Sequence, residues 1–341
     1  MRNAAYWQRR IETLEDATYR VAAATATQME GLVMQAQREL ENQIAGWYVR
    51  FAENNQIDLA DAKLRLTANQ LAEFRWDVNQ YIAHAKANTI DQRWTRQLEN
   101  ASARVHITRL QALQVQTQQT IERLFGNQLD MMDSLLKRQF LDRYYKMMFE
   151  VQRGLGVGWD FAGVDERRLN ALMNKPWTTD GRSFSNRIWG DKDRLIAELH
   201  KTLTQSLITG QNPNELVAEF ASKMNTTKNN AARLIRTESA AVAAVADKEV
   251  YDELNITKYR ILATLDKKTS DICQKMDGKL FRKSEYEVGI TAPPLHPNCR
   301  SATVPHFDDN FGERIARDND GKTYHVPHDM TYPEWRRRYA S

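Results

Sequence analysis

Three residues near the C-terminus carry side chains of the kinds that bind zinc. They are Cys273, His296 and Cys299, and the chain contains no third cysteine. Thiolate sulfur and imidazole nitrogen are common ligands of Zn²⁺, which takes four ligands in a structural site. These three residues are therefore candidate metal ligands, but a complete site needs one more.

Two aspartates, Asp266 and Asp277, lie close enough in the sequence to supply a fourth ligand. The pairs Cys-x-x-Cys and Cys-x-Cys, by which many zinc sites are recognised, are missing, because Met276 and Ser301 occupy the positions of the second cysteine. We therefore interpret the segment as a turn-rich structural element, in which Asp266 and Thr269 cap local turns, and we predict no bound cofactor. Zinc is the alternative.

Four of the seven histidines lie in the same C-terminal region, at His296, His306, His325 and His328. With the cysteines and aspartates they form a set of the kind that a metal-dependent nuclease uses. No paired-carboxylate motif accompanies the set, and the sequence has no glycine-rich phosphate loop and no metalloprotease helix motif. We therefore predict that the protein is not an enzyme and has no catalytic residue. A metal-dependent nuclease or DNA-binding module is the alternative.

Arg236, Thr237 and Glu238 follow one another in a predicted helix. Side chains two positions apart on a helix do not face each other, so Arg236 and Glu238 do not pair. We expect Arg236 to pair with a carboxylate elsewhere in the fold and Glu238 to hold a loop in place.

The chain ends in a basic segment, in which Arg336, Arg337 and Arg338 follow Trp335. Arginine side chains neutralise the phosphates of nucleic acids, so these three are candidates for contact with DNA. A solvated terminus explains the same residues equally well. The sequence leaves both interpretations open.

The composition is that of a globular protein. Of the 341 residues, 42% are hydrophobic and 27% are charged, which excludes wholesale disorder. The formal net charge of +4 is too small to indicate a dedicated nucleic-acid-binding protein. The mean hydropathy is −0.66, no run approaches about 18 apolar residues, and the first residues show no apolar signal core, so we predict no membrane span. Two cysteines exclude a disulfide scaffold and favour a reducing compartment.

Helix-breaking residues are distributed unevenly along the chain. The first of the eight prolines is Pro176, and three of the fourteen glycines come before residue 154. Apolar residues that recur three or four positions apart predict amphipathic helices throughout this half. We therefore expect an elongated helical region over residues 1–153.

Two details of this helical region follow from its pattern. Residues 91–125 have the periodicity of one long helix, which Gly126 and Asn127 interrupt because glycine is a strong helix breaker. Residues 111–119 are rich in glutamine. We interpret them as a solvated helix face, with a partner-binding face as the alternative.

The second half of the chain has a mixed composition. A glycine cluster at Gly154, Gly156, Gly158 and Gly163 predicts a hinge and connector over residues 154–190, followed by an α+β domain over 191–310 and a tail over 311–341. Helices are expected at 191–208, 213–224 and 226–254, with Thr226 or Thr227 capping the last. A short helix is expected within 266–278, a loop at 290–299, and strands at 258–265, 279–281 and 301–304.

The predicted fold class is therefore mostly α, with an elongated N-terminal helical region. The C-terminal domain is predicted to be compact and α+β, and to contain a small antiparallel sheet.

Five groups of residues, taken in chain order, resemble the motifs of one protein family. They are Asp180-Gly181 with Phe184 and Arg187-Ile188-Trp189; Arg233 to Glu238; Thr264 to Asp266 with Thr269 and Cys273; Asp277-Gly278-Lys279; and Pro293 to Ser301. Together they resemble the phage head morphogenesis family, the minor capsid proteins related to the F protein of phage Mu. The resemblance implies that twelve of the motif residues have a structural role and shape the domain. They are Arg236, Thr237, Glu238, Asp266, Thr269, Cys273, Asp277, Gly278, His296, Pro297, Cys299 and Arg300.

The resemblance implies a phage minor head protein, which is a structural component and no enzyme. It implies association with the portal protein inside the procapsid and assistance in head assembly and in genome packaging or delivery. The implied location is the interior of the virion head, and the host cytoplasm during assembly. The implied partners are the portal protein, capsid or scaffold proteins and packaged double-stranded DNA, with residues 1–153 as the docking region.

Overall fold

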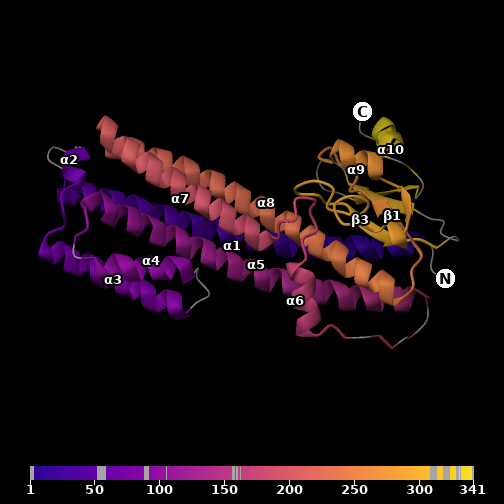
Figure 1. Cartoon of the computed structure of the whole chain (residues 1–341). Helices are drawn as coiled ribbons and strands as arrows, with labels where there is room; N and C mark the ends of the chain where they lie inside the picture. The colour runs from indigo at the N-terminus through magenta and orange to yellow at the C-terminus, as the bar shows by residue number, and fades with distance from the viewer. Residues whose placement is uncertain are drawn as a thin grey trace. The chain divides into compact units, whose positions relative to one another are not determined.

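The computed structural model describes residues 4–51, 59–87, 92–104, 106–155, 158, 160–161, 163–307, 313–317, 323–327, 330 and 332–339 (Figure 1). The helices are α1 (Ala4–Phe51), α2 (Leu59–Ala62), α3 (Ala68–Ala87), α4 (Gln92–Ala103), α5 (Arg109–Leu155), α6 (Glu166–Asn174), α7 (Phe184–Thr209), α8 (Pro213–Glu253), α9 (Asp271–Met276) and α10 (Tyr332–Tyr339). The strands are β1 (Lys258–Leu262), β2 (Leu280–Arg282), β3 (Ala302–Pro305), β4 (Glu313–Arg317) and β5 (Thr323–Pro327). Long helices with a small antiparallel sheet near the C-terminus confirm the predicted fold class.

The elements form two compact units, each assembled from separate stretches of the chain. One unit, here called the sheet unit, comprises Met1–Ala26, Asp133–Phe184 and Arg233–Ser341. The other, here called the helical unit, comprises Thr27–Met132 and Ser185–Ala232. The domain boundaries predicted at residues 153, 190 and 310 stay predictions.

The helical unit is a bundle of helix segments around an apolar core. Its α3 and α4 pack against each other. The core that they share with the start of α5 is formed by Phe74, Val78, Tyr81, Ile82, Leu98, Ile107 and Ala112. Burial of these large side chains is the main favourable contribution to folding of this part of the chain.

A capping box starts both α3 and α5. The hydroxyl groups of Thr67 and Thr108 accept a hydrogen bond from the backbone N–H three residues later, and the side chains of Gln70 and Gln111 accept one in return. The continuous helix predicted over residues 91–125 is therefore wrong, because α4 ends at Ala103 and α5 begins at Arg109, directly after its capping residue Thr108. The Thr-x-x-Gln spacing is the sequence signal for this helix start.

The helix break predicted at Gly126 and Asn127 is also wrong. Helix α5 continues through both residues, although an interior glycine costs about 1 kcal/mol relative to alanine. The neighbouring Phe125 and Gln128 are buried. Tertiary packing of these side chains therefore outweighs the local propensity of the glycine.

The helix start predicted at Thr226 or Thr227 is wrong for a related reason. Both residues lie inside α8. Their hydroxyl groups donate hydrogen bonds to the carbonyls of Ser222 and Lys223, at 3.2 and 3.1 Å, in the preceding turn of the same helix. A threonine that bonds back in this way does not cap a new helix.

The glutamine-rich stretch of α5 does not form a solvated face, so that interpretation is wrong. Within the predicted stretch of residues 111–119, Gln111 is exposed, but residues 112–119 are buried or half-buried within the helical unit. The Thr120 hydroxyl donates to Glu39 at 2.9 Å and accepts from Gln43 at 3.0 Å. The carbonyl oxygen of Gln114 lies 3.1 Å from Nε2 of His200 on α7. Thr120 and Gln114 thus bond to α1 and α7, which the sequence pattern does not reveal.

The sheet unit contains a three-stranded antiparallel sheet in the order β2-β1-β3. Tyr259 on the central strand pairs with Phe281 and with Pro305. The three strands predicted by alternation are confirmed, with small shifts at their ends, and α9 confirms the short helix expected between the first two. The hairpin of β4 and β5 lies in residues 311–341, where the sequence predicts a tail.

Small residues let the sheet approach α8 closely. Residues 240–246 of this helix are mostly alanine, as the sequence shows. Tyr251, Tyr259 and Tyr286 form a buried aromatic cluster beside them. The Tyr286 hydroxyl donates a hydrogen bond to the backbone carbonyl of Ala244 at 2.9 Å. A large side chain in this segment would block that bond.

The end of α5 receives a buried tryptophan. The indole of Trp7 on α1 packs over Gly154, where a Cβ atom would lie 2.2 Å from the ring. The glycine that the sequence assigns to a hinge therefore serves close packing here. Gly156, a further member of the predicted glycine cluster, lies outside the described residues.

A buried ion pair joins α5 to α8. The Arg143 guanidinium donates two hydrogen bonds of 2.7 Å to the Asp247 carboxylate, and the two side chains are 2% and 3% exposed. Glu15 on α1 accepts a longer bond of 3.4 Å from the same guanidinium. Burial raises the pKa of Glu15 to about 7, against the attraction of Arg143. Helix α1 is thus bound to Arg143 through Glu15, a carboxyl group whose raised pKa disfavours its ionised form.

None of the helices in the described part of the chain is long and apolar enough to cross a membrane.

Replacing Asp247 with asparagine tests the importance of the buried pair. The variant leaves the Arg143 charge buried without its carboxylate, and we expect the free energy of unfolding to fall by about 3 kcal/mol or more. Asp142→Asn is the matched control, because it breaks an exposed pair with Lys146 on the same helix and should cost less than about 1 kcal/mol. Urea denaturation measures both. Equal losses in the two variants would show that the buried pair has no special role.

Candidate functional site

The motif at residues 236–238 of α8 holds two loops against the helix. The Thr237 hydroxyl accepts a hydrogen bond from the backbone N–H of Asn298 at 3.1 Å. The buried carboxylate of Glu238 accepts one from the indole N–H of Trp177 at 2.8 Å. Successive residues of a helix point in different directions, so two neighbours reach two separate loops.

Arg236 of the same motif is half-buried. Its Nε atom is buried and has no hydrogen-bond partner among the described residues. The carboxylate partner predicted for it stays a prediction.

Asp266, four residues after the end of β1, is bound by Arg300. The guanidinium donates to both carboxylate oxygens, and the bond from Nη2 to Oδ1 is 2.8 Å long. The backbone N–H of Lys268 and the hydroxyl of Thr269 also donate to Oδ1, at 2.8 and 3.2 Å. Burial opposes ionisation of Asp266, but these donors outweigh it and hold the pKa below its usual value. The carboxylate is engaged on both oxygens and anchors the segment that carries Arg300.

Asp277 and Gly278 turn the chain from α9 back into the sheet. The Asp277 carboxylate accepts a hydrogen bond from the backbone N–H of Ala263 at 2.9 Å. Gly278 has φ of +75°, a conformation that favours glycine, and its N–H donates to the Ile261 carbonyl at 3.0 Å. Both residues therefore shape the fold beside β1.

The three candidate metal ligands meet between α9 and the loop of residues 290–299. The Sγ atom of Cys273 lies 3.6 Å from Sγ of Cys299 and 3.2 Å from Nε2 of His296. All three ligand atoms lie within 4.8 Å of one another. The cysteines are 2% and 4% exposed, and the histidine is half-buried. Neither Asp266 nor Asp277 belongs to this group among the described residues.

Local hydrogen bonds orient two members of this group, Cys273 and His296. Ser270 caps α9, and its side chain accepts a hydrogen bond from the backbone N–H of Cys273 at 3.3 Å. The carbonyl oxygen of Pro297 lies 2.8 Å from Nδ1 of His296. A carbonyl only accepts, so Nδ1 carries a proton and donates, and Nε2 is turned toward Cys273.

The two thiols have unequal acidities. The hydrogen bond from Cys273 lowers the pKa of Cys299 despite burial, and His296 acts in the same direction. The same bond, together with burial, raises the pKa of Cys273. A hydrogen bond with Cys299 also raises the pKa of His296. The group therefore favours a thiolate at Cys299 beside the imidazole, and thiolate is the form that binds metals.

The other three histidines of the C-terminal set are placed differently. The backbone N–H of His306 donates to the Lys258 carbonyl at 3.0 Å, which extends the pairing of β3. His325 is on β5, but its side chain lies outside the described residues, as does all of His328. Within the described part of the chain, His296 is the one histidine of the four that meets the cysteines.

The C-terminal helix α10 is anchored by Trp335. This side chain is buried against Leu265, Val326 and Met330, and its indole N–H donates to the Tyr324 hydroxyl at 2.7 Å. Arg337 and Arg338 are exposed, and the side chain of Arg336 lies outside the described residues. Contact of these arginines with nucleic acid stays a prediction.

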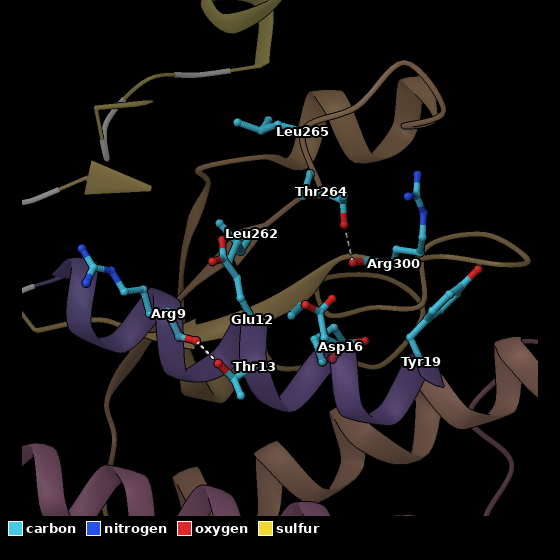
Figure 2. A pocket seen from close by; sticks show the side chains of 12 residues that line it. Arg9, Glu12, Thr13, Asp16, Tyr19, Leu262, Thr264, Leu265 and Arg300 are labelled. Carbon is cyan, nitrogen blue, oxygen red and sulfur yellow. Dashed lines mark hydrogen bonds between the residues drawn. The ribbon is translucent and has the colours of Figure 1, made fainter. Parts of the chain in front are cut away.

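A cleft of about 310 Å³ lies between the start of α1 and the end of β1. Figure 2 shows Arg9, Glu12, Thr13, Asp16 and Tyr19 of α1 on one side of it. Leu262, Thr264 and Leu265, from the end of β1 and the residues after it, lie on the other side with Arg300, which precedes β3. Acidic and basic side chains are mixed along it, so its charge does not select one class of ligand. Its two walls are far apart in the sequence, and no local pattern predicts it.

Residues 197–304 match the family model described as Phage Mu protein F like protein. The match covers all twelve motif residues from Arg236 to Arg300 and the strands β1 and β2. It confirms the predicted resemblance and contains four of the five motif groups, whereas the group at residues 180–189 lies outside the matched segment.

Three curated proteins share low sequence identity with this chain. Minor head protein GP7 of Bacillus phage SPP1 is 23% identical over 239 residues, which are 64% of this chain and 75% of that protein. NAD(+)--arginine ADP-ribosyltransferase EFV of Enterococcus faecalis is 25% identical over 213 residues, 56% of this chain and 41% of that protein. An uncharacterized protein of Haemophilus influenzae is 23% identical over 128 residues, 38% of this chain and 28% of that protein. The chain thus spans less than half the length of the last two. No solved structure matches it.

Replacing Thr237 with valine tests whether α8 holds the loop of residues 290–299. Valine keeps the side-chain shape but removes the acceptor of the Asn298 N–H, so we expect the free energy of unfolding to fall by about 1–2 kcal/mol. Limited proteolysis should also cut the loop faster. Thr226→Val is the matched control, because that exposed hydroxyl donates to a carbonyl of its own helix. Equal effects of both variants would contradict the role of Thr237.

Proposed function

We propose that this protein, whose residues 197–304 match the Phage Mu F-like family, is a phage minor head protein. The observation that carries the proposal is that polar motif residues of this segment bond to one another. Asp266 is bound by Arg300, and Thr237 accepts from Asn298. Such internal pairing is typical of a structural module, since a catalytic group has to face a substrate. The likeness to Minor head protein GP7 over 75% of that protein supports the same function.

In this proposal the protein associates with the portal inside the procapsid and assists head assembly and genome packaging or delivery. It lies in the interior of the virion head, and in the host cytoplasm during assembly. Its partners are the portal protein, capsid or scaffold proteins and packaged double-stranded DNA. A net charge of +4 suits a protein that lies beside DNA without binding it tightly.

The proposal assigns docking on the portal or capsid to the helical region of residues 1–153. The connector over 154–190, the head morphogenesis domain over 191–310 and the tail over 311–341 complete the proposed organisation. Exposed apolar side chains on the long helices, such as Val49 and Trp76, support the docking assignment. Burial of apolar surface is the main driving force of association between helices.

Co-expression with the portal protein of the same phage tests the proposal. We expect the full chain to co-purify with the portal, and to be present in procapsids and virions separated by sedimentation. Affinity purification and mass spectrometry of the particles measure both. A chain that is found in none of these three assemblies is not a minor head protein.

Two matched variants locate the docking surface. Trp76 on α3 is 66% exposed and belongs to residues 1–153, whereas Ile208 on α7 is 62% exposed and lies outside that region. A tryptophan at the centre of an interface contributes about 2 kcal/mol or more to binding. We therefore expect Trp76→Asp to reduce co-purified portal at least about tenfold, and Ile208→Asp to leave it unchanged. If Ile208→Asp reduced the co-purified portal and Trp76→Asp did not, the docking surface would lie outside residues 1–153.

One of the similar proteins is named as an ADP-ribosyltransferase, so the proposed structural role can be tested by assaying this chain for that activity. We propose that this chain has no such activity, because its match covers 41% of that protein and its motif residues serve the fold. Purified chain incubated with NAD⁺ and an arginine-containing acceptor should release no nicotinamide above the rate without protein. Release coupled to modification of the acceptor would show that the protein is an enzyme.

A further inference from the structure

We propose that Cys273, His296 and Cys299 bind one Zn²⁺ ion, with a water molecule as the fourth ligand. This inference is independent of the proposed role in the phage head, because it rests on the geometry of three side chains. Zinc takes four ligands in a tetrahedral arrangement, and sites with three protein ligands keep one position open to water. The half-buried imidazole marks the side of the group from which solvent reaches it.

The distances within the group are close to those that zinc requires. With Zn–S of about 2.3 Å, two thiolates in a tetrahedral site lie about 3.8 Å apart, and a sulfur and an imidazole nitrogen lie about 3.6 Å apart. The observed separations are 3.6 Å between the two Sγ atoms and 3.2 Å between Sγ of Cys273 and Nε2 of His296. For these two pairs, outward movements of a few tenths of an ångström reach the zinc distances, and the third pair lies within the 4.8 Å that encloses all three ligand atoms.

The surrounding structure holds the ligands in place before any ion binds. Cys273 is fixed by the Ser270 cap of α9, and the loop with the other two ligands is tied to α8 through Thr237 and Asn298. The Pro297 carbonyl accepts from Nδ1 of the imidazole. A hydrogen bond of this kind at the second nitrogen orients metal-bound histidines and selects the tautomer that binds through Nε2.

Charge balance also favours a divalent ion. Two thiolates and one Zn²⁺ sum to zero, which suits a site whose two sulfur ligands are buried, because an unbalanced buried charge is costly. The nearby carboxylates do not compete as ligands. Asp266 is paired with Arg300, and Asp277 accepts from the backbone of Ala263.

A disulfide between the two cysteines would use the same thiols. It requires the sulfur atoms to approach from 3.6 Å to about 2.05 Å and needs an oxidant, and it gives the His296 imidazole no part in the bond. A zinc ion engages all three side chains with only small shifts from their present positions. The zinc site is therefore the more complete explanation of the arrangement.

The test is the metal content of the full chain, purified under reducing conditions without a metal-binding tag and dialysed. Elemental analysis should find about one zinc per chain, in line with a single site. We expect Cys273→Ser and Cys299→Ser to lose at least about nine-tenths of it, because three ligands become two. His306→Ala is the control that should keep the zinc, since this residue lies outside the group.

Cobalt titration of the unmodified chain covers the case in which a cysteine variant does not fold. Co²⁺ bound by two thiolates gives a charge-transfer absorption in the near ultraviolet, and added Zn²⁺ should abolish it. Absence of this band together with absence of zinc in the purified chain would overturn the proposal. A Cys273–Cys299 disulfide in chain isolated with thiols blocked at lysis would overturn it as well.

Discussion

The buried ion pair between Arg143 and Asp247 is the contact on which the sheet unit depends. It joins α5 to α8 through two hydrogen bonds of 2.7 Å, and neither side chain is more than 3% exposed. A buried charge without its partner costs several kcal/mol. If either helix shifted along the other, one of the two charged side chains would lose its partner while still buried. Glu15 adds α1 to the same guanidinium. One pair of charges thereby sets the register of three helices.

This register determines where the motif on α8 lies. Thr237 and Asp247 are on one continuous helix, about 15 Å apart at 1.5 Å per residue. Because the ion pair fixes α8 near its C-terminal end, the helix presents Thr237 and Glu238 at a defined place, where each binds a loop. The loop on Thr237 carries two of the three proposed zinc ligands, so the site depends on the helix packing below it.

The fold could be predicted where its signals are local. Periodicity in the first half and alternation near Tyr259 identify helices and strands, because both depend on residues a few positions apart. The predicted break at Gly126 and the predicted start at Thr226 are wrong, since packing against distant residues outweighs local propensity in α5 and α8. The capping box at Thr108 is the exception, because it is a local signal that periodicity alone does not detect.

The sequence by itself determined the residue types, the approximate elements and the ordered motifs that the family match confirms. It also identified Cys273, His296 and Cys299 as zinc-binding types. Only the tertiary structure decided that these three meet, and that Asp266, one of the two aspartates that could have supplied a fourth ligand, is bound by Arg300 at a separation of 34 residues. The physical reason is that such contacts depend on how helices and sheet pack, and packing follows from burial and charge pairing across the whole chain.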